Sequence, residues 1–311
     1  MTSLLNWVPY QLQQRKNDWR LDWMDMKEHH IQEPFFDETI SLCLMKMRER
    51  STYKPLSNME FLLEAALKVD HIAPTAFIFH VSRCGSTLLS QALSTDSLNM
   101  VYAEAPLLDQ ILRAPFQDKN SRGDIEKWFK AALKIMGQQR KCSYQQLYIK
   151  LDSWHVHFYP LLRRWFPRTP FYFLSREPDA VIASHKKRRG LHSIPGIIQE
   201  HLLKVQLNTK HYEDFNLFTS EVLTQYYLAM QGIAIRKNPL DYFFDYSWGI
   251  SDLVAHFFSS IGIISDKENE MMRRFSYHSK YPDQPFTAKQ DMGWVNYPKA
   301  NNAYRKLIAS L

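Results

Sequence analysis

The residues best suited to chemistry lie in a short loop between an apolar stretch and a helix-like stretch. Residues 77–81 (FIFHV) are apolar and aromatic, as in a buried strand, and residues 82–85 (SRCG) lead to a helix that we expect to begin near Ser86. This arrangement points backbone N–H groups and the positive end of a helix at one place, which is how proteins hold a phosphate. Gly85 lets the backbone approach an anion closely, because it has no Cβ. We therefore predict a phosphate-binding loop.

The loop lacks two residues of the nucleotide-triphosphatase pattern G-x-x-x-x-G-K-[ST]. His80 stands where that pattern has its first glycine, and Ser86 stands where it has lysine. The lysine neutralises the β- and γ-phosphates, and the hydroxyl beside it helps to hold Mg²⁺. These departures weaken a kinase or ATPase interpretation, which stays open as an alternative. The loop keeps one cation, Arg83, ahead of the glycine.

Five short apolar segments predict the strands that position this loop. They are residues 75–81, 100–103, 146–151, 170–174 and 241–246. Helix-like stretches lie between them, which is typical of βαβ units with a mostly parallel sheet and ligands at the carboxyl ends of its strands. We predict an α/β fold, with a mostly parallel central sheet flanked by helices, for a domain over residues 71–311.

The first seventy residues have a different character, rich in tryptophan, methionine and charge. Residues 37–48 show helical spacing, with Asp37 available as a cap. We predict a helical N-terminal segment over residues 1–70. Its aromatic side chains could form a lid over a bound acceptor or pack on the sheet, and both interpretations stay open.

Composition narrows the class of partner and the compartment. The formal net charge of +7 and the pI near 9.1 favour an anionic partner without choosing among nucleotide, nucleic acid, membrane and acidic substrate. The three cysteines, Cys43, Cys84 and Cys142, have no metal-type spacing, so we expect no disulfide framework, no zinc site and a cytoplasmic location. With no signal peptide and no apolar run near the roughly 20 residues of a membrane helix, we predict neither secretion nor membrane insertion.

The sequence S-R-C-G-S-T-L-L resembles the 5′-phosphosulfate loop of the sulfotransferase superfamily, commonly written [KR]-S-G-T-T. Arg83, Gly85, Ser86 and Thr87 occupy the matching places, while Cys84 and Ser86 replace the usual Ser and Thr. The resemblance implies metal-independent transfer of a sulfuryl group from 3′-phosphoadenosine 5′-phosphosulfate (PAPS) to a hydroxyl or amine of a small-molecule or peptide acceptor. Adenosine 3′,5′-bisphosphate (PAP) is then the second product.

A second segment, residues 171–185, resembles the 3′-phosphate segment of the same family. Arg176 and Ser184 have the family's spacing of eight residues, and Pro178 suits the first turn of a helix between them. The resemblance assigns both side chains to the 3′-phosphate of the nucleotide. Ser279 and Lys280, in the part that resembles the nucleotide-closing segment, are further candidates for its phosphate side.

Sulfuryl transfer needs an activated acceptor, neutralisation of the charge on the transferring group and in-line placement. The motif layout is most similar to the tyrosylprotein-type branch, in which a Glu serves as base 21 residues beyond the loop cation. Glu104 has this spacing from Arg83, and Lys150 resembles the lysine that stabilises the bridging oxygen. The alternatives are an exposed loop Glu and a lysine paired with Asp152.

Other assignments remain open at this point. Many family members use a histidine base, for which His155 and His157 are the candidates, although a cap or surface role is more usual for such residues. The cationic run 186–189 is best explained as a solvated helix end. A wall of the site for PAPS or an acidic acceptor is the next interpretation, and nucleic acid is the least expected partner. A nucleotide-binding module without catalysis is a further alternative. Neither the acceptor's identity nor the oligomeric state follows from the sequence.

Overall fold

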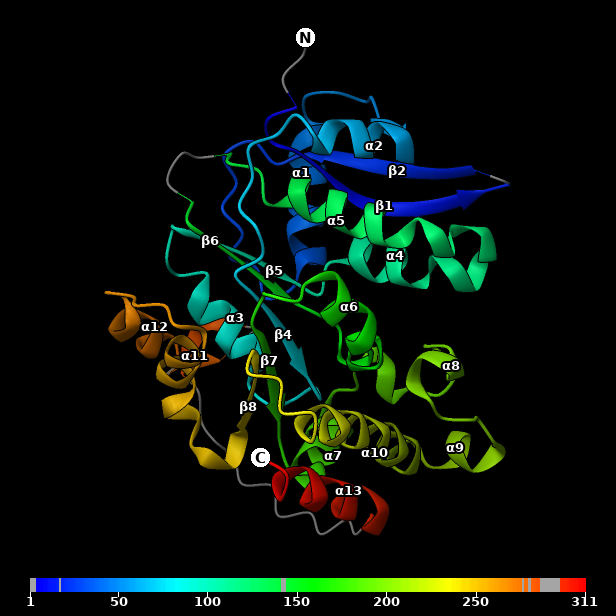
Figure 1. Cartoon of the computed structure of the whole chain (residues 1–311), viewed down its shortest axis with the longest axis vertical. Coiled ribbons are helices and arrows are strands. Elements are labelled where there is room, and N and C mark those ends of the chain that lie inside the picture. The colour runs from blue at the N-terminus through cyan, green and yellow to red at the C-terminus, as the bar shows by residue number, and fades with distance from the viewer. Residues whose placement is uncertain (1–3, 17, 141–143, 276, 279–280, 286–296) are drawn as a thin grey trace. The chain divides into compact units, whose positions relative to one another are not determined.

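The structure, a computed structural model of the whole chain, describes residues 4–16, 18–140, 144–275, 277–278, 281–285 and 297–311 (Figure 1). The chain divides into two compact units. Unit 1 comprises residues 1–76 and 90–150, and unit 2 comprises residues 77–89 and 151–311. Within the described residues, no helix combines the length and the apolar character that a membrane crossing needs.

A five-stranded sheet confirms the predicted α/β class. Its strands, in spatial order, are β5 (Asn99–Ala103), β6 (Gln146–Lys150), β4 (Ala76–His80), β7 (Phe171–Ser175) and β8 (Asp241–Asp245). The β5–β6, β4–β7 and β7–β8 pairs are all parallel. Every residue of β4, β5 and β7 is buried, which explains why these strands are continuous apolar runs in the sequence and not alternating patterns.

Unit 1 contains a second, antiparallel sheet that the sequence interpretation missed. It is formed by β1 (Trp7–Arg15), β2 (Asp18–Asp25) and β3 (Leu56–Asn58). The predicted helical N-terminal segment therefore contains a small antiparallel sheet in addition to its helices. The signal was present in β2, where Trp19, Leu21 and Trp23 are buried and alternate with polar residues, which is the period-two pattern of a half-buried strand.

The helices of unit 1 include the one predicted near residue 37. This helix, α1, spans Phe36–Arg48, but its N-cap is Phe35, and Asp37 lies in the first turn without capping it. The other elements of the unit are α2 (Met59–Ala66), α4 (Pro106–Gln117), η1 (Lys119–Gly123) and α5 (Ile125–Met136).

Unit 2 packs helices on both faces of β7. Phe171 and Phe173 contact Tyr159 of α6 (Tyr159–Trp165), whereas Tyr172 contacts Phe257 of α11 (Leu253–Ile261). The alternation follows from strand geometry, since successive side chains point to opposite faces.

The other helices of unit 2 that position the site are α7 (Pro178–Lys187), α10 (Phe215–Ala234) and α13 (Pro298–Ile308). Shorter elements complete the unit: η2 (Ser153–Phe158), η3 (Leu191–Ser193), α8 (Glu200–Leu203), α9 (Thr209–Glu213), η4 (Tyr246–Trp248), η5 (Ile250–Asp252), α12 (Glu268–Arg274), β9 (Tyr277–His278) and β10 (Tyr281–Pro285). Helix α3 (Ser86–Leu93) begins in unit 2 and ends in unit 1.

Candidate functional site

The loop between β4 and α3 has an unusual backbone. Ser82 and Arg83 have φ of 73° and 52°, and Gly85 has φ of 87°. Left-handed conformations cost about 1–3 kcal/mol for residues other than glycine, so two in succession need support from their surroundings. Turns of this kind gather successive backbone N–H groups into a concavity that binds anions. The predicted phosphate loop therefore has a backbone suited to that task.

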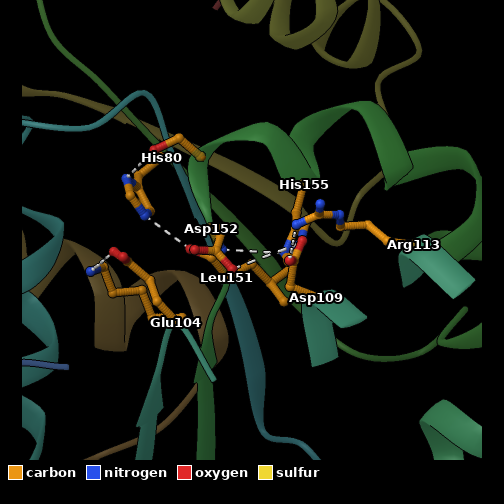
Figure 2. Close-up of polar contacts among 9 residues, drawn as sticks. His80, Glu104, Asp109, Arg113, Leu151, Asp152 and His155 are labelled. Carbon is orange, nitrogen blue, oxygen red and sulfur yellow. Dashed lines mark hydrogen bonds and ion pairs between the residues drawn. The ribbon is translucent and has the colours of Figure 1, made fainter. Parts of the chain in front are cut away.

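His80 supplies part of the support for the loop. Its Nδ1 accepts a hydrogen bond from the backbone N–H of Ser82 at 3.0 Å. Its Nε2 lies 2.9 Å from the carbonyl oxygen of Leu151 (Figure 2). Because Nδ1 accepts, Nε2 carries the proton and donates to Leu151 in a neutral ring. The side chain is buried, with 4% of its surface exposed. The residue that replaces the first glycine of the triphosphatase pattern is thus a brace for the strained turn.

Two features require glycine at position 85: the space beside its Cα is filled, and its backbone φ is positive. A Cβ at this position would lie 2.6 Å from Cδ1 of Ile250 and 3.7 Å from the side chains of Tyr246 and Leu253. Helix α3 begins at the next residue, Ser86, and the Gly85 carbonyl accepts the first helical hydrogen bond, from Leu89 N–H at 2.9 Å. The positive end of the helix consequently opens at the loop.

The cysteine of the loop points into the protein. Cys84 is fully buried, so its thiol packs in the core, and the backbone N–H is the part of this residue that can serve a ligand. Ser86 is also buried, with 3% exposed, while Arg83 and Thr87 are partly exposed. The Arg83 guanidinium donates to the carbonyl oxygen of Arg188, just after α7.

Arg176, the second predicted cation, contacts this loop. It follows β7 directly, and its Nη1 donates to the carbonyl oxygen of Arg83 at 3.0 Å. Its guanidinium carbon lies 4.2 Å from the ring centroid of Tyr246, and its Nε is buried without a hydrogen-bond partner. The two sequence motifs, far apart in the chain, therefore come together. Ser184 lies on α7, which begins at Pro178 as predicted, and it is partly exposed.

Glu104 and Lys150 form an ion pair within unit 1. Glu104 follows β5 with φ of 55°, and Lys150 ends the adjacent strand β6 with none of its side chain exposed. The Lys150 ammonium donates to Glu104 Oε1, and the ring centroid of Phe35 lies 5.0 Å from Nζ (Figure 2). A buried ammonium needs such a partner, and the pair leaves the Glu104 side chain 25% exposed.

The two candidate histidines have different surroundings. His155 is buried, and its Nδ1 accepts from the backbone N–H of Asp152 at 3.2 Å in a capping box of η2. His157 lies in the same element with Nε2 buried and without a hydrogen-bond partner. Burial, with a smaller contribution from Lys204, lowers the pKa of His157 to about 4. The cap interpretation thus fits His155, and His157 is a weak base.

Two further predictions have different outcomes. Ser279 and Lys280 lie outside the described residues. In the cationic run, Lys186, Lys187 and Arg188 are exposed at the end of α7, as expected for a solvated helix end, and Arg189 donates to Asn216 Oδ1 at 2.8 Å.

Sequence reasoning missed the residues that hold Arg176. Tyr246 stacks on its guanidinium, and the hydroxyl of Tyr227 donates to its carbonyl oxygen at 2.6 Å. A signal existed for Tyr246, because it closes the predicted strand over residues 241–246 at the edge where ligands bind. None existed for Tyr227, which lies in the middle of α10 and looks like any core residue of an amphipathic helix.

No model of a protein family matches the sequence, and no curated protein matches it. Among solved structures, the sulfotransferase STF1 from Mycobacterium tuberculosis H37Rv is similar with a TM-score of 0.48 at 13% identity, over 80% of this chain and 81% of that one. The sulfotransferase domain from the curacin biosynthetic pathway has a TM-score of 0.42 at 14% identity, over 70% and 80%. The sulfotransferase domain from the Synechococcus PCC 7002 olefin synthase has a TM-score of 0.42 at 16% identity, over 78% and 94%.

Proposed function

We propose that this chain is a sulfotransferase that moves a sulfuryl group from PAPS to a hydroxyl or amine of a small-molecule or peptide acceptor. The observation that carries the proposal is the contact between the strained loop at Arg83 and the second cation, Arg176, at 3.0 Å. A single phosphate would need only the loop. Two cationic motifs that meet suit a nucleotide with phosphates at both its 5′ and its 3′ position.

In this proposal the donor lies on the loop and on the start of α3. The backbone N–H groups of residues 84–87 and the Arg83 side chain hold the 5′-phosphosulfate. Arg176 and Ser184 hold the 3′-phosphate, and the buried, unpartnered Nε of Arg176 supports a ligand at that side chain, because such donors are seldom left without an acceptor. Ser279 and Lys280 remain candidates for the same phosphate side from the sequence alone.

The reaction is a direct displacement at sulfur. The acceptor oxygen or nitrogen forms a bond to sulfur while the bond between sulfur and the bridging oxygen of PAPS breaks, and PAP leaves with that electron pair. Glu104 takes the acceptor's proton, and the cations Lys150 and Arg83 stabilise the charge on the leaving oxygen. The ion pair between Lys150 and Glu104 supports these roles, since it brings the proposed base and a proposed cation together. No metal takes part in this scheme.

Two other functions are separable by experiment. A kinase or ATPase would use Mg²⁺ to bridge the transferred phosphates, but the loop has Ser86 in place of the usual lysine. A binding module without catalysis would hold PAP and transfer nothing. Among the contacts of the described residues reported above, none favours either alternative.

The test is an acceptor screen with sulfur-labelled PAPS. The protein is incubated with phenols, primary amines and tyrosine-containing peptides, with and without EDTA, and labelled product and PAP are separated chromatographically. We expect acceptor-dependent PAP release that EDTA does not change and that Arg83→Gln abolishes. Magnesium-dependent ATP turnover would support a kinase or ATPase, and PAP binding with no transfer to any acceptor would support the binding module.

A further inference from the structure

A carboxylate without exposed surface lies at the end of β8, one residue before the tyrosine that supports Arg176. Asp245 is 0% exposed and accepts hydrogen bonds from the hydroxyls of Ser175 at 2.6 Å, Ser247 at 2.6 Å and Tyr304 at 2.9 Å. The backbone N–H of Ser247 adds a fourth at 2.9 Å. Burying a charge is costly unless its hydrogen-bonding capacity is met, so the residues that meet it are held in place by the same interaction.

The Asp245 network aligns the ends of two strands. Ser175 and Asp245 are register partners of the parallel β7–β8 ladder, and their side chains are hydrogen-bonded. The residues that directly follow the two strands, Arg176 and Tyr246, form the guanidinium–ring stack, with 4.2 Å between the guanidinium carbon and the ring centroid. A shift between the strand ends would therefore separate the Arg176 guanidinium from its ring.

Tyr304 is connected to Arg176 through two separate sets of contacts. Its hydroxyl joins the Asp245 network, and its ring contacts the Tyr227 ring with centroids 5.4 Å apart. The Tyr227 hydroxyl donates to the carbonyl oxygen of Arg176 at 2.6 Å. One side chain of the last helix thus contacts both structures that hold the arginine.

Helix α13, which carries Tyr304, packs against α10 and α7 (Figure 1). Asn301 of α13 donates to Asp179, in the first turn of α7, at 3.4 Å. Helix α7 is also the element that carries Ser184, the other residue assigned to the 3′-phosphate. The C-terminal helix is consequently linked to the elements that hold Arg176 and to the helix that carries Ser184.

We propose that Tyr304 and Asp245 are positioning residues for Arg176, so that docking of the C-terminal helix is coupled to binding of the 3′-phosphate. The proposal rests on the function proposed above. An arginine held in its binding conformation loses less freedom when a ligand arrives, and this preorganisation appears as affinity. The coupling is reciprocal, so a nucleotide with a 3′-phosphate also holds α13 in place more firmly than one without it.

The first test uses Tyr304→Phe, which removes one hydroxyl and keeps the ring on Tyr227. Its matched control is Tyr297→Phe, at the N-cap of α13, where the hydroxyl donates to Asp214 at 3.3 Å away from this network. Affinities for PAP and for 5′-AMP are measured by titration calorimetry. We expect Tyr304→Phe to weaken PAP binding by about three- to tenfold, the range of one hydrogen bond, and to leave 5′-AMP unchanged. Tyr297→Phe should change neither, and equal losses for both nucleotides in Tyr304→Phe would overturn the proposal.

A double-mutant cycle separates positioning from general support. In the Arg176→Ala background, Tyr304→Phe should weaken PAP no further, because the residue through which it acts is gone. Additive losses would show that Tyr304 acts elsewhere.

Hydrogen exchange without nucleotide gives an independent readout. The amides of residues 175–177 and 179 should exchange faster in Tyr304→Phe than in wild type or in Tyr297→Phe, and unchanged exchange would refute the link between α13 and the strand ends. If the wild type does not prefer PAP to 5′-AMP, the proposed function fails, while the exchange experiment still decides whether Tyr304 holds Arg176.

Discussion

Arg176 carries the specificity of the proposed nucleotide site, because it is the cation assigned to the one phosphate that distinguishes PAP from 5′-nucleotides. Arg176→Ala should weaken PAP binding by about 1.5–3 kcal/mol, the usual contribution of a charge-assisted hydrogen bond. Adenosine 5′-phosphosulfate lacks the 3′-phosphate and should bind wild type and variant alike. Arg164→Ala, which removes the same charge from an exposed position of α6, controls for net charge. Equal losses for both nucleotides in Arg176→Ala would make this arginine structural.

Glu104 is the residue on which catalysis depends in the proposed scheme. Glu104→Gln should leave PAPS affinity nearly unchanged and lower turnover by about 10²- to 10⁴-fold, the range for loss of a general base. The variant also removes the carboxylate that contacts the buried Lys150 ammonium, so unfolding should become easier. Glu104→Gln combined with Lys150→Met removes both charges and should recover stability without recovering turnover. Near-wild-type turnover in Glu104→Gln would transfer the role of base to another residue.

His157 should make the fold sensitive to mild acid. Its pKa falls from 6.5 to about 4 through burial and the charge of Lys204. Between these values the unfolded chain binds a proton that the folded chain does not, so the free energy of unfolding drops as the pH is lowered from 6.5 to 4. At about 1.4 kcal/mol per pKa unit, the loss amounts to about 3 kcal/mol. Urea unfolding at several pH values should show a shallower decline in His157→Gln, and parallel curves would contradict the assignment.

At the scale of elements, the turn between β4 and α3 is the most constrained part of the site. Gly85→Ala should lower the free energy of unfolding by about 1–3 kcal/mol, because it places a Cβ at positive φ and against Ile250. Gly232→Ala is the matched control, on an exposed face of α10 where an added Cβ meets nothing within 4 Å. That variant should raise the free energy of unfolding by about 0.5–1 kcal/mol. Denaturant melts of both variants measure the difference, and equal effects would mean that the turn is unstrained.

The elements differ in how clearly the sequence encodes them. The strands of the parallel sheet were predicted because burial on both faces makes each one a continuous apolar run, as in β4 and β7. The antiparallel β1–β2 pair was missed because the helical spacing of residues 37–48 was extended to the whole N-terminal segment, although β2 alternates buried Trp19, Leu21 and Trp23 with polar residues. Whether an element is a helix or a strand could therefore be predicted wherever a single hydrophobic period dominated its sequence.

The candidate site was predictable only where a local motif exists. The loop and Arg176 follow from short patterns, whereas the braces at His80, Tyr227 and Asp245 act across long sequence separations. His80 binds Leu151, and Asp245 binds Tyr304, through contacts that no local pattern records. The supporting roles of these residues can be recognised only once the strands are placed side by side.

At the scale of the whole molecule, the net charge of +7 agrees with an anionic ligand without identifying it. Ligand selectivity is therefore the property that separates the candidate functions. A ligand that binds only the native state stabilises it by RT ln(1 + [L]/Kd), about 2.7 kcal/mol at a hundred times Kd. The rise in melting temperature with each nucleotide therefore reports which nucleotide class the protein binds.

The most direct test of the nucleotide site is thermal unfolding of the wild-type protein with PAP, 5′-AMP, ATP, and ATP with Mg²⁺, each at the same concentration. A sulfotransferase site predicts the largest rise in melting temperature with PAP in the absence of Mg²⁺, and a smaller rise with 5′-AMP. Arg176→Ala should reduce the PAP shift to that of 5′-AMP. A larger shift with ATP and Mg²⁺ than with PAP, or no shift with PAP, would contradict the account.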